Sequence, residues 1–240
     1  MKKIYTSIIL SFLLLIAAGA TAQVKSYIGL YGGLSVPRGD FASYNYDNNS
    51  AGFAKRGVTI SIDGAYYFYK NLGIGASLAF QDQGELKYND TYILAQGYTN
   101  SFNADYTTVT AVNRYHSLSF LAGPQYSFQY HKFILDLRAS AGFIKVTSTP
   151  SLSIVMSGVP EQTDIIDQKS ASGTVFGYSG NVGLRYKFSD NWTVGIKSTY
   201  ISTDGPNVTT ENRQLNVGRL VTRQPMTALQ TTIGMTLNIK

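Results

Sequence analysis

The stretch YHSLSFLAGPQYSFQYHKFILDLRASAGFIKV, residues 115–146, decides the fold class because apolar and polar side chains alternate along almost all of it. A short polar interruption at residues 130–132 divides the stretch in two. In the second half, Leu137 lies on the apolar side, opposite Asp136 and Arg138. Alternation with a period of two residues is the signature of a β-strand, and two such runs around a tight turn predict an antiparallel hairpin.

The same period recurs along the chain, and no helical period or long apolar run follows Gln23. The segments that carry it lie at about 26–35, 57–69, 72–83, 115–130, 133–146, 174–188, 192–202 and 227–239.

The connections between these segments alternate strictly in length. Tight turns fall at residues 70–71, 130–132 and 189–191, and long polar connections fall at about 36–56, 84–114, 147–173 and 203–226. Barrels in outer membranes have this arrangement, with short periplasmic turns and long external loops. We therefore predict an all-β fold: an antiparallel up-and-down transmembrane β-barrel of about eight strands.

The first residues of the chain predict export. Two lysines precede an apolar run at residues 8–18, which is too short to span a bilayer as a helix. The sequence ATA at residues 20–22 has the form that signal peptidase accepts. We expect residues 1–22 to be a cleaved signal peptide and residues 23–240 to form a barrel domain in the outer membrane of a Gram-negative cell.

The composition restricts the chemistry that the chain can perform. It has no cysteine, which excludes disulfides and thiolate metal sites. Only 14% of its residues are charged, well below the roughly 25% of soluble domains. The net charge is +6 without a basic cluster, and export also argues against nucleic acid as a partner.

Aromatic residues gather around the tight turns, where amphipathic rings favour the interface between hydrocarbon and water. This girdle comprises Tyr66, Tyr67, Phe68, Tyr69, Tyr126, Phe128, Tyr130, Phe133, Tyr186, Phe188 and Trp192. Alternation alone does not say which face points inward, so a soluble lipocalin-like barrel is the alternative. The girdle and the scarcity of charge on the polar faces favour a membrane barrel whose apolar faces contact outer-membrane lipid.

Several short motifs carry a resemblance to a known family: GLYGG at 29–33, PRGDF at 37–41, GPQY at 123–126 and TIGMTLNI at 232–239. With them the chain resembles the eight-stranded outer-membrane barrels of the OmpA-transmembrane-domain and OmpX-like group, most closely the Bacteroidetes-type "outer membrane protein beta-barrel domain". The resemblance implies an outer-membrane location and a last strand that the assembly machinery recognises. The family usually ends on an aromatic residue, whereas Ile239 and Lys240 stand here. The family is functionally mixed, so the resemblance implies location better than activity.

Catalytic and metal sites are not expected in this chain. The two histidines, His116 and His131, are distant in sequence, and His116 cannot share a strand face with the adjacent Ser117. Acidic residues at 161–167 allow a calcium site, but a solvated loop is the simpler interpretation. We predict no catalytic residues, no cofactor and no metal.

Charged residues on the polar faces of the predicted strands form the candidate site. They are Asp63, Asp136, Arg138, Arg185, Lys187 and Lys197. The interior of an eight-stranded barrel is barely wide enough for its side chains, and buried charges must be paired or wet. We therefore expect a salt-bridged network that fills the lumen. Within it, Asp136 should lie beside Arg185 or Lys187, and the planar guanidinium of Arg185 suits a carboxylate better.

Two functions remain open at this point. The first is a non-enzymatic structural or surface-interaction protein with a polar, largely filled lumen, whose long external loops meet a partner. The second is a small passive, porin-like channel for small solutes, anions among them, because basic groups outnumber acidic ones on the polar faces.

Overall fold

The computed structural model describes residues 24–159, 165–211 and 218–239. The expected signal peptide, residues 1–22, lies outside these described residues. None of the helices within the described ranges is long and apolar enough to cross a bilayer.

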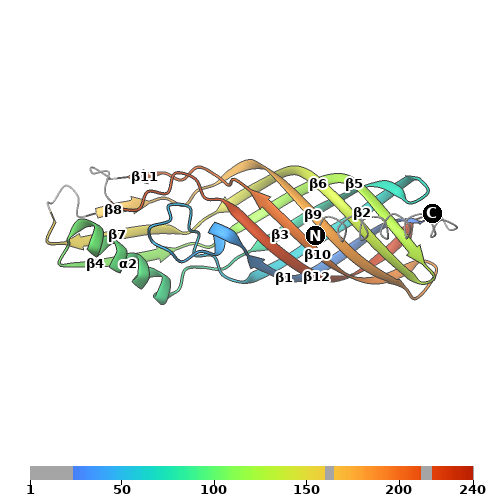
Figure 1. The fold of residues 1–240 in the computed structure, drawn as a ribbon, viewed down its shortest axis with the longest axis horizontal. Coiled ribbons are helices and arrows are strands. Elements are labelled where there is room, and N and C mark those ends of the chain that lie inside the picture. Colours follow the sequence, from blue (N-terminus) through green and yellow to red (C-terminus); the bar gives the residue numbers. More distant parts are fainter. Residues whose placement is uncertain (1–23, 160–164, 212–217, 240) are drawn as a thin grey trace, which may run out of the picture.

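Eight antiparallel strands close into a barrel (Figure 1). They are β1 (Ser26–Pro37), β2 (Gly57–Tyr69), β3 (Leu72–Asp82), β5 (His116–Tyr130), β6 (Phe133–Ser148), β9 (Gly173–Lys187), β10 (Trp192–Thr203) and β12 (Met226–Ile239). Their order around the barrel is β1-β12-β10-β9-β6-β5-β3-β2. The first and last strands pair from Ser26–Ile239 to Pro37–Ala228 and so close the barrel along their whole length. The predicted up-and-down barrel is confirmed, and each predicted strand end lies within about two residues of the observed one.

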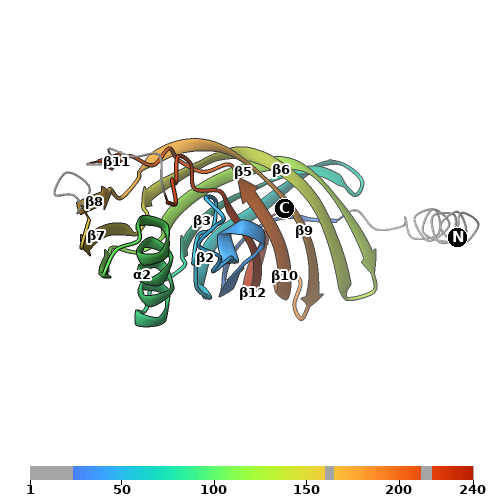
Figure 2. The same ribbon diagram turned by 60° about the vertical axis from the view of Figure 1, so that its left-hand side comes forward.

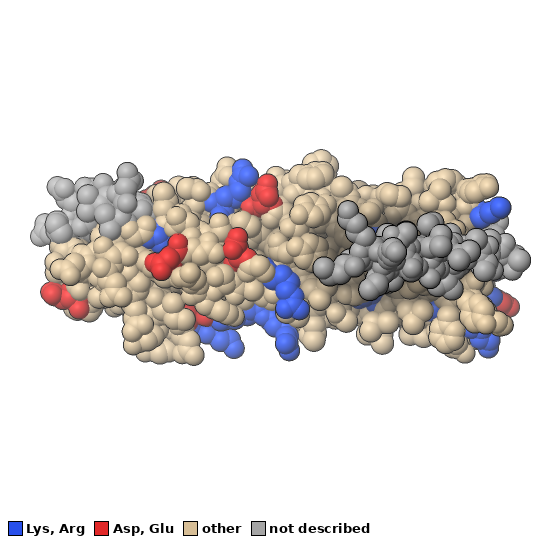
Figure 3. Space-filling view, in the orientation of Figure 1, with Lys and Arg blue, Asp and Glu red and all other residues tan. Residues whose placement is uncertain are grey.

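The apolar faces of the strands point outward, as a membrane barrel requires. Leu30, Phe176 and Ile233 are each more than half exposed, whereas Ser, Thr, Gln and charged side chains line the lumen. In Figure 3, charged residues gather over the external half and at the far rim, and the visible wall between them is almost entirely uncharged. The fold therefore follows the membrane interpretation rather than the lipocalin-like one, in which the apolar face would fill the interior.

One residue of the expected aromatic girdle is placed differently. Tyr67 is only 4% exposed and points into the lumen. It shares strand β2 with Asp63 and lies four residues away from it, so both side chains fall on the inward face. Its neighbours Tyr66 and Phe68 point outward at the rim with the other exposed rings. The girdle is present, but without Tyr67.

The long connections fold into a compact external module, which the period of the sequence does not predict. A second sheet has the order β11-β8-β7-β4, and a helix packs against it at the end of the molecule opposite the tight turns (Figures 1 and 2). Its elements are η1 (Gly39–Ala42), α2 (Tyr88–Phe102), β4 (Tyr106–Val112), β7 (Ser151–Ser157), β8 (Ile165–Gln168) and β11 (Thr210–Glu211).

The sequence shows no helical period after Gln23, yet the long polar connections contain a helix and a sheet, because their sparse apolar residues share one core. Leu94 and Tyr98 of α2 pack with Ile154 of β7 and Ile166 of β8. The helix begins where the backbone N–H of Lys87 donates to the Asp90 carboxylate at 2.7 Å, an N-terminal cap. Only one stripe of α2 is apolar, so its period is hidden among Tyr, Asn, Gln and Thr.

Candidate functional site: a charge network in the barrel lumen

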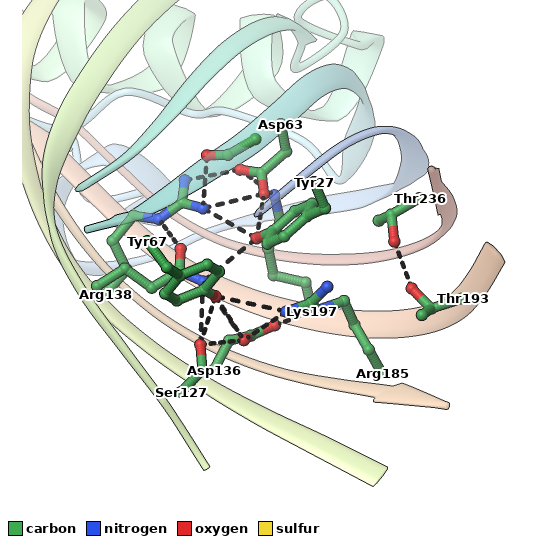
Figure 4. A network of polar contacts seen from close by, with 12 residues as sticks. Tyr27, Asp63, Tyr67, Ser127, Asp136, Arg138, Arg185, Thr193, Lys197 and Thr236 are labelled. Carbon is green, nitrogen blue, oxygen red and sulfur yellow. Dashed lines mark hydrogen bonds and ion pairs between the residues drawn. The ribbon is translucent and has the colours of Figure 1, made fainter. Parts of the chain in front are cut away.

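The carboxylate of Asp63, on β2, forms the first centre of the lumen network. The Nη1 of Arg138, on β6, lies 2.8 Å from its Oδ2, and the Nη2 lies 3.1 Å from its Oδ1. The Nζ of Lys197, on β10, lies 3.0 Å from the same Oδ2. Asp63 is 1% exposed, so a single buried carboxylate binds two cations that come from distant strands (Figure 4).

Asp136, on β6, forms the second centre. The Nε of Arg185, on the neighbouring strand β9, donates to its Oδ2 at 2.6 Å, and the Nη2 donates to its Oδ1 at 2.9 Å. This is the two-bond geometry in which a guanidinium and a carboxylate match best. The hydroxyl of Ser127 also donates to Oδ1, at 2.5 Å.

Neutral side chains join the two centres. Tyr27 donates its hydroxyl to Asp63 at 3.1 Å, and its ring lies 3.8 Å below the guanidinium carbon of Arg185. Gln125 accepts a bond from the Nε of Arg138 at 2.7 Å and donates to the hydroxyl of Tyr67 at 2.5 Å. A cation over an aromatic face is stabilised further when water is excluded. The network is therefore one continuous unit rather than two separate ion pairs.

The lumen above this network is also filled. Gln81 and Gln230 hydrogen-bond across it at 2.6 Å, and Phe41 of η1 packs into an apolar cluster with Leu121 and Ile144 at the external mouth. Two cavities between these layers have volumes of about 20 and 10 Å³.

The structure brings together five of the six predicted site residues and excludes one. Asp63, Asp136, Arg138, Arg185 and Lys197 form the network, and the expected pair of Asp136 and Arg185 is present. Lys187 does not join them: its Nζ lies 2.8 Å from Asp190 at the tight turn. As the last residue of β9, Lys187 reaches water at the rim, where it lowers the pKa of Asp190 by hydrogen bonding and by charge.

Four neutral members of the network were not identified as site residues from the sequence. They are Tyr27, Tyr67, Gln125 and Ser127. A signal was available, because Tyr67 shares its strand face with Asp63, and Gln125 and Ser127 were already on a predicted polar face. What alternation cannot supply is which side chains reach across the lumen to one another.

The groups weighed for catalysis or metal binding do not assemble a site. His116 lies at the external rim, where its Nε2 is 3.4 Å from Asp82, and His131 lies in a tight turn at the opposite end. Glu161 and Asp164 of the acidic loop lie outside the described residues, and Asp167 accepts a bond from Ser153 at 2.8 Å. Among the described residues, no group of three or more His, Cys, Asp or Glu could hold a metal ion.

Comparison with known proteins gives a match along most of the chain. A family model described as "Outer membrane protein beta-barrel domain" matches residues 8–219. No curated protein matches the sequence.

Solved structures with a similar fold include those of three bacterial proteins. Neisserial surface protein A has 12% identity and a TM-score of 0.49, covering 91% of this chain and 100% of its own. The attachment invasion locus protein Ail of Yersinia pestis has 12% identity and a TM-score of 0.43, with the same coverage. The outer membrane protease OmpT of Escherichia coli has 9% identity and a TM-score of 0.42, covering 90% of this chain and 96% of its own.

Proposed function

The chain belongs to the outer-membrane protein β-barrel domain family, and from that premise we propose that its barrel is a filled, non-enzymatic anchor for the external module. The observation that carries this proposal is the buried network in the lumen. Arg138 is 5% exposed and Arg185 is 1% exposed, and each binds a carboxylate through two nitrogens. A lumen closed by paired charges suits a rigid support better than a passage.

The external module is the working surface in this proposal. Its apolar core includes Leu94 and Ile154, both fully buried, so it presents a defined shape rather than mobile loops. Because it stands at the end away from the tight turns, it faces the outside of the cell when those turns are periplasmic. A partner that meets the cell surface would contact this module first.

Export and assembly complete the proposal. Residues 1–22 direct secretion and are then removed, and the last strand, β12, is read by the outer-membrane assembly machinery. The exposed apolar wall holds the mature barrel in outer-membrane lipid. No cofactor, metal or nucleic acid takes part.

Electrical recording in planar bilayers tests the filled lumen. We expect the inserted protein to give no steady single-channel current, with a large general porin in the same bilayer as the positive control. Insertion is verified separately, by the change in gel mobility between folded and heat-denatured protein.

The alternative function is a small anion-preferring channel. The observation in its favour is that three cations, Arg138, Arg185 and Lys197, face only two carboxylates in the network. Reproducible current steps that carry chloride better than potassium would support this channel and contradict the filled anchor.

A further inference from the structure

Strand β4 is the open edge of the external sheet. In the order β11-β8-β7-β4 it pairs, within the described part of the chain, with β7 alone. Helix α2 packs on the inner face of the sheet, where Leu94 and Tyr98 meet Val109, and does not lie in the plane of the strands. An unpaired strand edge is a template for another strand, and proteins usually blunt it with charge, proline or a bulge. The sequence of β4, YTTVTAV, contains no charged residue and no proline.

The register shows which backbone groups point to this open edge. The backbone N–H of Lys169 donates to the carbonyl of Thr209 at 2.9 Å, so in β8 this residue bonds to β11, and the alternate residues Gln168 and Ile166 bond to β7. Their partners in β7 therefore bond to β8, and the residues between those partners bond to β4, among them Ser151, which pairs with Val112. By alternation, Thr108 and Thr110 also bond to β7, and the N–H and C=O groups of the residues between them point away.

The free groups belong to Thr107, Val109 and Ala111, and none of the described residues forms a backbone bond with them. We propose that this edge binds β4 of a second copy of the chain, carried by a facing membrane. Antiparallel pairing centred on Val109 places Val109 opposite its own copy and Thr107 opposite Ala111. All three residues then exchange both of their bonds. This inference deepens the proposed surface role and depends on it.

The side chains of β4 fit the same register. On the exposed face, Thr108 lies opposite Thr110 of the copy, and Tyr106 lies opposite Val112, and both kinds of pair stabilise sheets. At the ends, Asp105 of one strand meets the Asn113–Arg114 end of the other. Asp105 and Arg114 are both exposed, and Arg114 already lies 3.1 Å from Asp82 of its own chain, so in the pairing it would be shared between Asp82 and Asp105 of the copy.

The direction of β4 decides where the second copy must be anchored. Figure 1 shows β4 and β7 running along the long axis of the molecule, which is the axis of the barrel. The two-fold axis that relates adjacent antiparallel strands of one sheet is perpendicular to that sheet, and here it is also perpendicular to the barrel axis. Such an axis turns the second barrel to point the opposite way. Two barrels in one membrane point the same way, so the paired copies belong to two membranes that face each other.

Vesicles of phosphatidylcholine and phosphatidylglycerol test this pairing. Two populations that carry the protein and different fluorophores are mixed, and their joint movement is followed by dual-colour fluorescence cross-correlation. Wild-type vesicles should pair across the two populations, and protein-free vesicles should not. The double variants Thr108→Lys/Thr110→Lys and Thr108→Glu/Thr110→Glu should each lose pairing with themselves, because like charges face each other across the join.

Mixing the lysine vesicles with the glutamate vesicles should restore pairing, since the facing charges are then opposite. The matched control, Val155→Lys/Ile165→Lys, places two lysines on the same exposed face, one and two strands in from the edge, and should pair like wild type. Every variant is first shown to be folded by its gel mobility.

Three results would overturn the proposal: wild-type vesicles that stay separate, like-charge variants that pair as well as wild type, or copies that associate only within one membrane. Binding of an extended foreign peptide at β4 without self-pairing would also overturn it. The filled-anchor proposal would survive each of these results, because it rests on the conductance measurement.

Discussion

The lumen network and the external core are two interiors of one chain, and they are built on opposite principles. Around Asp63 and Asp136 the barrel buries charge and turns its apolar side chains outward. Around Leu94 and Ile154 the external module buries apolar side chains, as a soluble protein does. The difference follows the solvent: hydrocarbon surrounds the barrel wall, and water surrounds the module.

The two interiors should therefore be destabilised by different kinds of substitution. In the lumen, losing one partner leaves a charge buried without compensation. In the module, losing a side chain leaves a cavity whose cost is set by its volume. Substitutions of each kind should therefore separate the two regions.

The largest effect is expected for Asp63→Ala. This change leaves both Arg138 and Lys197 buried without their shared carboxylate, which should lower the free energy of unfolding by about 3–5 kcal/mol. Urea unfolding in vesicles, followed by the fluorescence of the single tryptophan, Trp192, measures it. The control is Asp190→Ala at an exposed turn, which should leave the midpoint unchanged. A similar midpoint for both variants would show that the lumen is wet rather than dry.

A smaller loss is expected for Asp136→Ala, about 3 kcal/mol, because Arg185 keeps its contact with the ring of Tyr27. Adding Arg185→Met removes the unpaired cation and should recover part of the loss. The double-mutant cycle should give a coupling of about 1–3 kcal/mol. Additive effects of the two substitutions would mean that the pair contributes nothing in the membrane.

A local effect is expected for Ile154→Ala in the external core. The side chain is fully buried, so its truncation should destabilise the module by about 2–4 kcal/mol. Protease added to intact cells should then cut the module faster, while the gel mobility of the barrel stays that of the folded protein. Unfolding of both regions together would show that they form one cooperative unit.

The smallest effect is expected for Lys187→Met at the rim. Lys187 holds the pKa of Asp190 below its ordinary value, so the pair stabilises the fold above the unfolded pKa of the carboxyl group and loses this effect as the pH falls. The substitution should raise the pKa of Asp190, measured by NMR titration in detergent, without a measurable change in stability. An unchanged pKa would show that the two side chains do not meet in solution.

The barrel could be predicted from the sequence because each of its strands is visible as a local alternation of apolar and polar residues. Each strand alternates over ten or more residues, and loop length alternates with it. The external sheet could not be predicted, because β8 and β11 are only 4 and 2 residues long and pair across loops far apart in the sequence. Local periodicity carries no information about such pairing.

For the lumen network, contacts between neighbouring strands could be predicted, and contacts across the lumen could not. Strand height placed Asp136 beside Arg185 because β6 and β9 are neighbours in the sheet. The height of a residue above the tight turns could not place Arg138 beside Asp63, since two strands, β3 and β5, separate β6 from β2 around the barrel. Lys187 was wrongly assigned to the lumen network because alternation shows which face of a strand a residue is on, but not how far the residue lies from the water at the rim.

The contacts across the lumen also constrain how the barrel assembles. Asp63 reaches Arg138 past two intervening strands on one side, and Lys197 past β1 and β12 on the other. These contacts cannot form in a flat or half-curled sheet, whose lone charges would resist entry into hydrocarbon. They form together only at the circumference that eight strands produce. The network therefore stabilises the nascent chain only after its first and last strands have paired and closed a barrel of this circumference.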